Sequence, residues 1–195
     1  MSNRIGIMGG SFDPIHSGHL IIALDAVEQF ELEKVLFVPA YQAPLKSKSP
    51  SASAEARMKM VELATSDEDR FQASDVDYQC KDTSYSVRTA RNLKKEFPEA
   101  ELFWILGADQ IAQLHLWRDI EELARVVSFI AFDRPGSKNQ TSGKMPEHTR
   151  LLLGEPRPLQ ISSTEIRDRL KSHRGAKYFL PAKVFDYIKA ENLYI

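Results

Sequence analysis

The chain has 195 residues, of which 43 % are hydrophobic and 27 % charged, a composition that fits one globular domain with an ordinary core. A formal net charge of −1 excludes a general attraction to nucleic acid or to an anionic membrane, so any anion site must be local. The single cysteine, Cys80, excludes an internal disulfide and a thiolate metal cluster, and we expect a cytoplasmic protein without a secretory leader or a membrane span.

Strands and helices alternate along the chain. Residues 5–8 predict a buried strand, which a glycine-bearing turn connects to a helix over residues 20–30. The next elements in chain order are a strand at 35–38, a loop rich in proline, serine and lysine at 39–53, and a helix capped by Ser53 and ending at 64. An extended segment at 71–78, a helix at 84–97 and strands at 102–106 and 126–132 follow. The chain then continues with a polar loop at 133–148 and helices at 164–172 and 182–192.

This order of elements predicts an α/β fold with a doubly wound, mostly parallel sheet that helices cover on both faces. We expect residues 1–195 to form a single domain in which residues 164–195 are a C-terminal helical portion. Ligands of such sheets bind at the carboxyl ends of the strands. The first strand ends at the glycine-bearing turn and the strand at 102–106 ends at Gly107, so both strands can border one crevice.

The turn after the first strand carries the groups expected of a phosphate site. Its glycines let a ligand approach the backbone, and free N–H groups at the start of the helix attract anions. His16 lies just before the helix, and Ser17 as N-cap would place His19 in the first helical turn. The sequence leaves the protonation of both imidazoles open. The turn residues that we expect at the ligand are Gly9, Gly10, Ser11 and Phe12.

A second group of donors stands near the C-terminus. Ser162 or Ser163 can cap the helix that follows, and Arg167 lies one turn into it. Hydroxyl residues at a helix start are usually only caps, just as a glycine pair is usually only a turn. Together with Thr164 and the exposed N–H groups, however, these hydroxyls also form an anion site.

Both segments resemble the GxFxPxHxGH and ISSTxIR signatures of the nucleotidyltransferase superfamily of adenylyl- and cytidylyltransferases. Every fixed position is filled, the first from Gly10 to His19 and the second from Ile161 to Arg167. The resemblance implies a Rossmann-like nucleotidyltransferase fold. It also implies that His16 and His19 are catalytic and contact the α- and β-phosphates of ATP. The residues that it implies for the β- and γ-phosphates are Ser162, Ser163, Thr164 and Arg167.

The middle of the chain resembles bacterial nicotinate-mononucleotide adenylyltransferases. The matching segments are Pro44-Leu45-Lys46, Ser84-Tyr85-Ser86, Gly107-Ala108-Asp109, Leu114-His115-Leu116-Trp117 and Arg134-Pro135-Gly136. By this resemblance Gly107 and Asp109 belong to the ATP site, and Asp109 contacts the ribose. Trp117 stacks on the pyridine ring, and Tyr85 and Ser86 belong to the segment that meets the nicotinate carboxylate. Lys46 and Arg134 lie near the mononucleotide phosphate.

Several of these residues also fit simpler roles, because Trp117 could be a core residue, Asp109 a helix cap and Lys46 part of a solvated loop. The family usually has histidine in place of Leu45 and often threonine in place of Ser86. Where a tyrosine is common the chain has Arg118, which either reinforces the preference for a carboxylate or points to solvent, and we favour solvent. We interpret Trp104 as a core residue. The histidines expected to be structural or exposed are His115, His148 and His173.

The resemblance implies adenylyl transfer from ATP to nicotinate mononucleotide, with Mg²⁺ carried mainly by the ATP phosphates and with no dedicated metal site in the protein. Neither nucleic acid nor membrane is an expected partner, and the sequence leaves a homo-oligomer open. Three alternatives remain: an enzyme that prefers nicotinamide mononucleotide, another small-molecule nucleotidyltransferase of the phosphopantetheine adenylyltransferase or cytidylyltransferase type, and a nucleotide sensor without catalytic activity.

Overall fold

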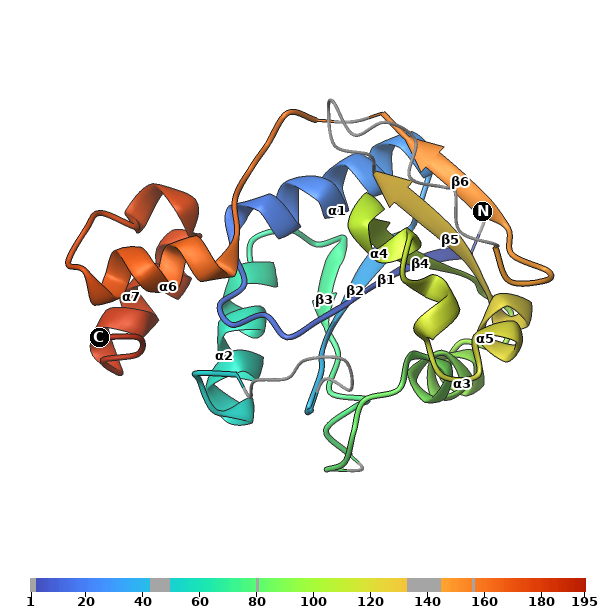
Figure 1. Cartoon of the computed structure of the whole chain (residues 1–195), viewed down its shortest axis with the longest axis horizontal. Helices are drawn as coiled ribbons and strands as arrows, with labels where there is room; N and C mark the ends of the chain where they lie inside the picture. Colours follow the sequence, from blue (N-terminus) through green and yellow to red (C-terminus); the bar gives the residue numbers. More distant parts are fainter. Residues whose placement is uncertain (1–2, 43–49, 80, 133–144, 156) are drawn as a thin grey trace.

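The computed structural model describes residues 3–42, 50–79, 81–132, 145–155 and 157–195. Its six strands pair side by side in the order β3-β2-β1-β4-β5-β6, and all five pairings are parallel (Figure 1). The strands are β1 (Arg4–Gly10), β2 (Lys34–Pro39), β3 (Phe71–Ala73), β4 (Glu101–Gly107), β5 (Val127–Phe132) and β6 (Leu151–Gly154). The predicted α/β, doubly wound sheet is therefore confirmed.

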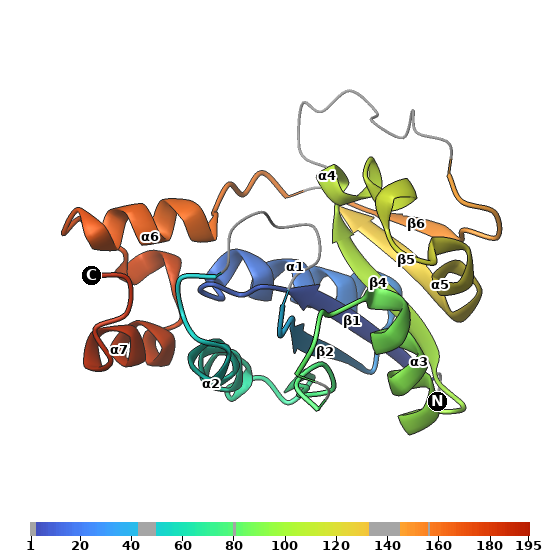
Figure 2. The same ribbon diagram turned by 60° about the horizontal axis from the view of Figure 1, so that its bottom comes forward.

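Helices cover both faces of this sheet (Figures 1 and 2). They are α1 (Ser17–Phe30), α2 (Ala54–Thr65), α3 (Ser86–Glu96), α4 (Ala108–Ile111), α5 (Ile120–Val126), α6 (Ser163–Lys171) and α7 (Ala182–Ala190), with short 3₁₀ segments η1 (Leu114–Leu116) and η2 (Lys177–Phe179). Alternate strand residues face opposite sides, so Val35 and Phe37 pack with α1 and α2. Leu36 and Val38 pack on the other face with α3 and α5.

The order of strands places a ligand crevice between β1 and β4. The chain builds outward from β1 through β2 to β3, then returns to β4 and builds in the other direction. Neighbouring parallel strands whose connections leave to opposite faces open a crevice at their carboxyl ends. Those ends are Gly10 in β1 and Gly107 in β4.

Helices α6 and α7 lie beyond the edge of the sheet and pack beside α2 (Figures 1 and 2). Their buried residues Ile166 and Val184 share one apolar cluster with Met60 of α2. The chain after β6 therefore brings α6 to the turn that follows the central strand β1. None of the helices in the described part of the chain is long and apolar enough to cross a membrane.

The structure corrects several expected boundaries. Helix α1 begins at Ser17 rather than at residue 20, and its N-cap is His16, so the expectation that Ser17 caps this helix is wrong. The extended segment at 71–78 contains only the short strand β3 (Phe71–Ala73). Strand β6 and helix α5 were not expected, because four and seven residues are too few to show a clear hydrophobic period. The Ser53 cap is confirmed, since its side chain accepts a hydrogen bond from Ala56 N.

Candidate active site

The turn after β1 has an unusual backbone that its surroundings hold in place. Phe12 has a φ of 46°, in the left-handed region that residues other than glycine rarely adopt. Its ring is buried and meets the ring of His19 edge-on, with 5.1 Å between the centroids. The peptide bond between Asp13 and Pro14 is cis. Helix α1 follows this turn, with His16 as its N-cap.

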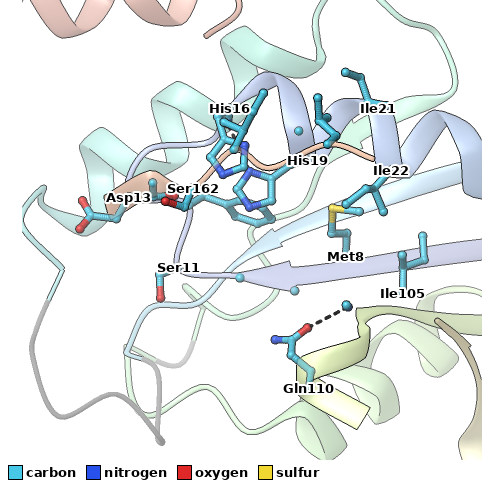
Figure 3. Close-up of a pocket in the computed structure, with 18 of the residues that line it drawn as sticks. Met8, Ser11, Asp13, His16, His19, Ile21, Ile22, Ile105, Gln110 and Ser162 are labelled. Carbon is cyan, nitrogen blue, oxygen red and sulfur yellow. Dashed lines mark hydrogen bonds between the residues drawn. The ribbon is translucent and has the colours of Figure 1, made fainter. Parts of the chain in front are cut away.

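His16 and His19 form one stacked pair at the start of α1. Their ring centroids lie 3.7 Å apart with an angle of 22° between the planes. The backbone N–H of His16 donates to Nδ1 of His19 over 3.2 Å, so the neutral His19 ring carries its proton on Nε2. Both rings line a cavity of about 800 Å³ at the carboxyl end of β1 (Figure 3). The sequence prediction that the two imidazoles face one site agrees with this placement.

Burial keeps His16 neutral. The residue is 5 % exposed, and desolvation lowers the pKa of its imidazole from 6.5 to about 4. Its Nδ1 atom has no hydrogen-bond partner among the described residues. At neutral pH His16 is therefore an uncharged imidazole, which offers hydrogen-bonding atoms and no charge to the cavity.

Lowering the pH should destabilise the fold through His16. Above pH 6.5 neither state protonates this residue, whereas between pH 6.5 and pH 4 the unfolded chain binds a proton that the folded protein excludes. We expect His16 alone to cost about 2 kcal/mol of unfolding free energy between pH 7 and pH 5. Urea unfolding at the two pH values measures this. The difference should shrink by that amount in His16→Gln, and an unchanged pH dependence in that variant would contradict the assignment.

Gly18 lies close to the imidazole pair. A Cβ atom on Gly18 would lie 3.1 Å from Nδ1 of His16 and 3.4 Å from Cβ of Ile161. The first distance is tighter than most Cβ contacts, so a methyl group would require the His16 ring to move by a few tenths of an ångström, whereas the second is an ordinary van der Waals contact. Glycine at this position thus leaves room for the His16 ring.

The second predicted motif docks directly on the first. Ser162 caps α6 by accepting a hydrogen bond from Glu165 N. Ser163 Oγ donates to the carbonyl oxygen of Pro14 over 2.8 Å, and Arg167 Nη1 donates to the carbonyl oxygen of Asp13 over 2.6 Å. Residues about 150 positions apart therefore border one cavity, as the sequence predicts. Because the Ser163 hydroxyl donates its proton to the Pro14 carbonyl oxygen, the backbone N–H of Ser163 is the donor that remains for an anion.

Asp13 is the centre of this docking, although no sequence motif marks it as a site residue. Its carboxylate accepts hydrogen bonds from Ser51 N and Ala52 N at 2.8 and 3.0 Å and from Tyr194 Oη at 2.8 Å. It also lies 3.7 Å from Nη1 of Arg167. Burial and the Asp13 charge raise the pKa of the Tyr194 hydroxyl, which stays protonated and donates. One buried carboxylate thus joins the turn to the segment before α2, to α6 and to Tyr194.

A second ion pair, between Asp25 and Arg157, lines the same cavity as His16 and His19. Arg157 donates to both carboxylate oxygens of Asp25, from Nε over 2.8 Å and from Nη2 over 2.6 Å. Asp25 is buried on α1, whereas the Arg157 side chain is 57 % exposed. This bidentate pair ties the segment before α6 to α1. Sequence reasoning missed it, because the two residues are separated by 132 positions.

A smaller cavity of about 380 Å³ adjoins the first and has an aromatic lining. Trp117 lies edge-on to the buried Trp104, with 6.0 Å between centroids, and the expectation that Trp104 belongs to the core is confirmed. Tyr85 is the N-cap of α3 and Ser86 its first residue. Arg118 is exposed, but it also lines the smaller cavity, where its guanidinium lies 4.6 Å from the centre of the Tyr85 ring, so the expectation that it points only to solvent is not confirmed. His115, His148 and His173 are exposed as well.

A buried carboxyl supports the α3 side of this smaller cavity. Thr89 Oγ1 donates to Asp77 over 2.6 Å, and both side chains are buried. Burial raises the pKa of Asp77, although hydrogen bonds from Thr89 and Ser84 oppose the shift. Ser84 Oγ also accepts from Tyr41 N over 2.9 Å. The network fixes the start of α3, where a ligand would meet Tyr85 and Ser86.

The two cavities meet at the turn after β1. Both are lined by Gly9, Gly10, Ser11 and Gln110. The larger cavity also contains the other predicted ATP-site residues whose side chains or backbone are described, namely Phe12, His16, His19, Gly107, Ser162, Ser163, Thr164 and Arg167. The smaller one contains Tyr85, Ser86 and Trp117. The roles of these residues toward a ligand stay predictions.

Three predicted contacts fall outside the described part of the chain. Lys46 and its neighbour Leu45 lie in the segment 43–49, and Arg134 lies in the segment 133–144. Asp109 belongs to α4, but its side chain is not among those described. Their proposed contacts with the ribose and the mononucleotide phosphate remain expectations.

Comparison with known proteins gives consistent matches over most of the chain. Residues 7–169 match the family described as Cytidylyltransferase-like. The "Probable nicotinate-nucleotide adenylyltransferase" of Opitutus terrae is 47 % identical over 191 residues, which cover 98 % of this chain and 97 % of that protein. The protein of the same name from Methylacidiphilum infernorum is 43 % identical over 197 residues, covering 100 % of this chain and 93 % of its own.

A solved structure shares the fold. The Plasmodium falciparum nicotinic acid mononucleotide adenylyltransferase complexed with NaAD superimposes with a TM-score of 0.78, covering 98 % of this chain and 97 % of its own, at 21 % identity. At that identity the likeness concerns the arrangement of strands and helices only.

Proposed function

The chain belongs to the cytidylyltransferase-like family, and within this family we propose that it is an enzyme that transfers the adenylyl group of ATP to nicotinate mononucleotide in NAD biosynthesis. The products would be nicotinate adenine dinucleotide and pyrophosphate. The observation that carries this proposal is the pair of adjoining cavities, one lined by imidazoles, hydroxyls and a guanidinium and the other by tryptophan, tyrosine and serine.

The larger cavity suits a triphosphate. Its donors come from two helix starts, α1 and α6, whose N–H groups and dipoles favour negative charge. The imidazoles of His16 and His19 would contact the α- and β-phosphate oxygens. Ser162, Thr164 and Arg167 would hold the outer phosphates. We propose on this basis that ATP is the nucleotide bound here.

The smaller cavity suits the pyridine of the acceptor. Trp117 supplies a flat apolar face, and the start of α3 supplies N–H groups and the Ser86 hydroxyl for a carboxylate. The acceptor phosphate would then lie where the two cavities meet, next to the α-phosphate of ATP. This arrangement explains why an aromatic cavity adjoins an anion site.

In the proposed reaction an oxygen of the mononucleotide phosphate attacks the α-phosphorus of ATP. The new P–O bond forms as the bond to the β-phosphate oxygen breaks, and pyrophosphate leaves with that electron pair. The nucleophile is already an anion, so no protein group needs to remove a proton, which agrees with a His16 that is neutral and a poor charge carrier. The protein aligns two mutually repelling phosphates and stabilises the charge that develops on their oxygens.

Mg²⁺ fits this proposal as a partner of the nucleotide. Among the described residues no group of three His, Cys, Asp or Glu side chains could hold a metal ion, and the carboxylates of the larger cavity, Asp13 and Asp25, are both in ion pairs. Phosphate oxygens and water would therefore supply most of the ligands, and the ion would neutralise phosphate charge. A cytoplasmic location and the oligomeric state stay predictions.

Release of pyrophosphate tests the proposal directly. The purified protein is incubated with ATP or CTP and Mg²⁺ and with one acceptor at a time: nicotinate mononucleotide, nicotinamide mononucleotide or phosphopantetheine. We expect release with ATP and nicotinate mononucleotide and a lower kcat/KM with the amide. Equal or higher kcat/KM with nicotinamide mononucleotide would overturn the acceptor assignment, and no release with any pair would favour a nucleotide sensor.

Replacing Trp117 should weaken the acceptor more than it slows the chemistry. Removal of one stacking aromatic costs about 1–3 kcal/mol, so Trp117→Ala should raise KM for nicotinate mononucleotide about fivefold or more. Steady-state kinetics with ATP held saturating measures this effect. Trp117→Phe keeps an aromatic face and serves as the control, and a KM for Trp117→Ala equal to that of the control would exclude stacking.

A further inference from the structure

Arg57 is a buried guanidinium for which neither sequence motif provides a function. It lies on α2, and its residue is 1 % exposed. Nη1 donates to the carbonyl oxygens of Ser11 and Ala40 over 2.8 and 2.6 Å, and Nη2 donates to that of Tyr41 over 3.0 Å. Nε has no hydrogen-bond partner, and no carboxylate of the described chain lies within ion-pair distance of Arg57.

The fold alone does not explain this charge. Three backbone carbonyls satisfy most of the N–H groups of Arg57, but neutral oxygens leave the positive charge uncompensated. A buried charge without a counter-ion is expensive, whereas a neutral side chain could make the same kind of hydrogen bond at lower cost. The guanidinium therefore points to an anion that the chain itself does not contain.

The position of Arg57 indicates where that anion would bind. Ser11, whose carbonyl oxygen holds Arg57, lines both cavities, and Ala40 lines the smaller one. The Ser11 hydroxyl is also buried and without a partner among the described residues, and in Figure 3 it points away from the imidazole pair. The Ser11 hydroxyl, which has no partner among the described residues, and the Arg57 guanidinium, which has no counter-ion there, therefore lie next to each other at the turn.

The neighbouring charges do not cancel that of Arg57. Asp13 carries one negative charge, which Arg167 offsets at 3.7 Å. His16 is neutral at pH 7. Glu55 interacts electrostatically with Arg57 but is exposed to solvent, so Arg57 has no buried counter-ion among the described residues around the turn.

We propose that Arg57 is a positioning residue for the acceptor phosphate: it fixes the Ser11 carbonyl, presents the Ser11 hydroxyl at the junction of the two cavities, and supplies the counter-charge of a phosphate monoester bound there. The identity of the acceptor rests on the proposed function. The binding of a phosphate at this junction does not.

Two substitutions separate the charge of Arg57 from its hydrogen bonds. Arg57→Lys keeps the charge and loses the planar fork, whereas Arg57→Gln loses the charge and keeps one amide donor group. We expect Arg57→Gln to raise KM for nicotinate mononucleotide by about tenfold, the scale of one charge acting through protein at an effective dielectric constant near 20. Arg57→Lys should stay within about threefold of the wild type on the same argument. The matched control is Lys59→Met, which removes an exposed charge from the same helix.

A second readout does not depend on turnover. Inorganic phosphate and nicotinate mononucleotide should raise the unfolding temperature of the wild type, Lys59→Met and Arg57→Lys, and should do so much less in Arg57→Gln and in Ser11→Ala. An equal ligand-induced shift in folded Arg57→Gln would overturn the proposal and leave Arg57 with a structural role only. If Arg57→Gln does not fold, the test rests on Arg57→Lys. A KM that stays near the wild-type value although the variant is less stable supports a role of the charge. A KM that rises together with the loss of stability shows that Arg57 acts only through its hydrogen bonds.

The outcomes also separate this proposal from the proposed function. A wild type that shows phosphate-induced stabilisation lost in Arg57→Gln, but no pyrophosphate release with any pyridine mononucleotide, supports the role of Arg57 and refutes the acceptor. Normal activity with an unchanged KM in folded Arg57→Gln supports the proposed function and refutes the role of Arg57.

Discussion

Replacing His19 with alanine should lower kcat by about a hundredfold or more while the protein still folds, because loss of one preorganised donor at a developing charge commonly costs about 3 kcal/mol. The effect should fall on kcat rather than on KM, since the donor is aligned with oxygens whose charge grows in the transition state. His16→Ala should act in the same direction. The two losses should be less than additive, because the rings stack at 3.7 Å and His16 N orients Nδ1 of His19.

Steady-state kinetics of purified variants, with circular dichroism to verify folding, measures this. His115→Ala is the matched control, because it removes an exposed histidine of the same chain. A kcat for folded His19→Ala that matches the control would remove His19 from the chemistry, and the same holds for His16.

Replacing Asp13 with alanine should cost about 3–5 kcal/mol of unfolding free energy, the range for breaking a buried ion pair by removing one partner. The substitution leaves Ser51 N, Ala52 N and Tyr194 Oη without their acceptor. It also leaves Arg167 without its nearest carboxylate. Because a typical domain is stable by only about 5–15 kcal/mol, much of the stability would be lost.

Urea unfolding at pH 7 measures the loss. Asp69→Ala removes an exposed carboxylate and should change stability by less than about 0.5 kcal/mol. Tyr194→Phe removes a single hydrogen bond to the same carboxylate and should cost about 1–3 kcal/mol. If Asp13→Ala is no less stable than Asp69→Ala, the carboxylate does not hold these segments together.

The sequence predicted those parts of the site that local patterns specify. Alternating apolar strands and helices predicted a doubly wound sheet, and such sheets bind ligands where their strands end, so His16 and Gly107 could be assigned to one crevice. The docking of Ser163 and Arg167 on the turn at Asp13 and Pro14 agrees with the expectation that two distant motifs converge. His16, Gly107 and Ser163 stand at a strand end or a helix start, which is where local sequence signals are strongest.

What the sequence did not show are the buried charges that join distant segments. Asp25 and Arg57 look like ordinary charged residues on amphipathic helices, and only the folded structure reveals that both are buried. Their partners are 132 and up to 46 positions away, so no local periodicity marks them. The N-cap was misassigned for a related reason. Serine is the commoner N-cap, whereas here His16 takes that position and its own N–H is bonded by the side chain of His19.

The bond between Tyr194 and Asp13 spans 181 positions, nearly the whole length of the chain. During synthesis on a ribosome the turn at Asp13 emerges 181 residues before the hydroxyl that completes its anchoring, so over that interval the Asp13 carboxylate lacks one of its partners. A truncation that removes Tyr194 would likewise remove a contact from the turn after β1.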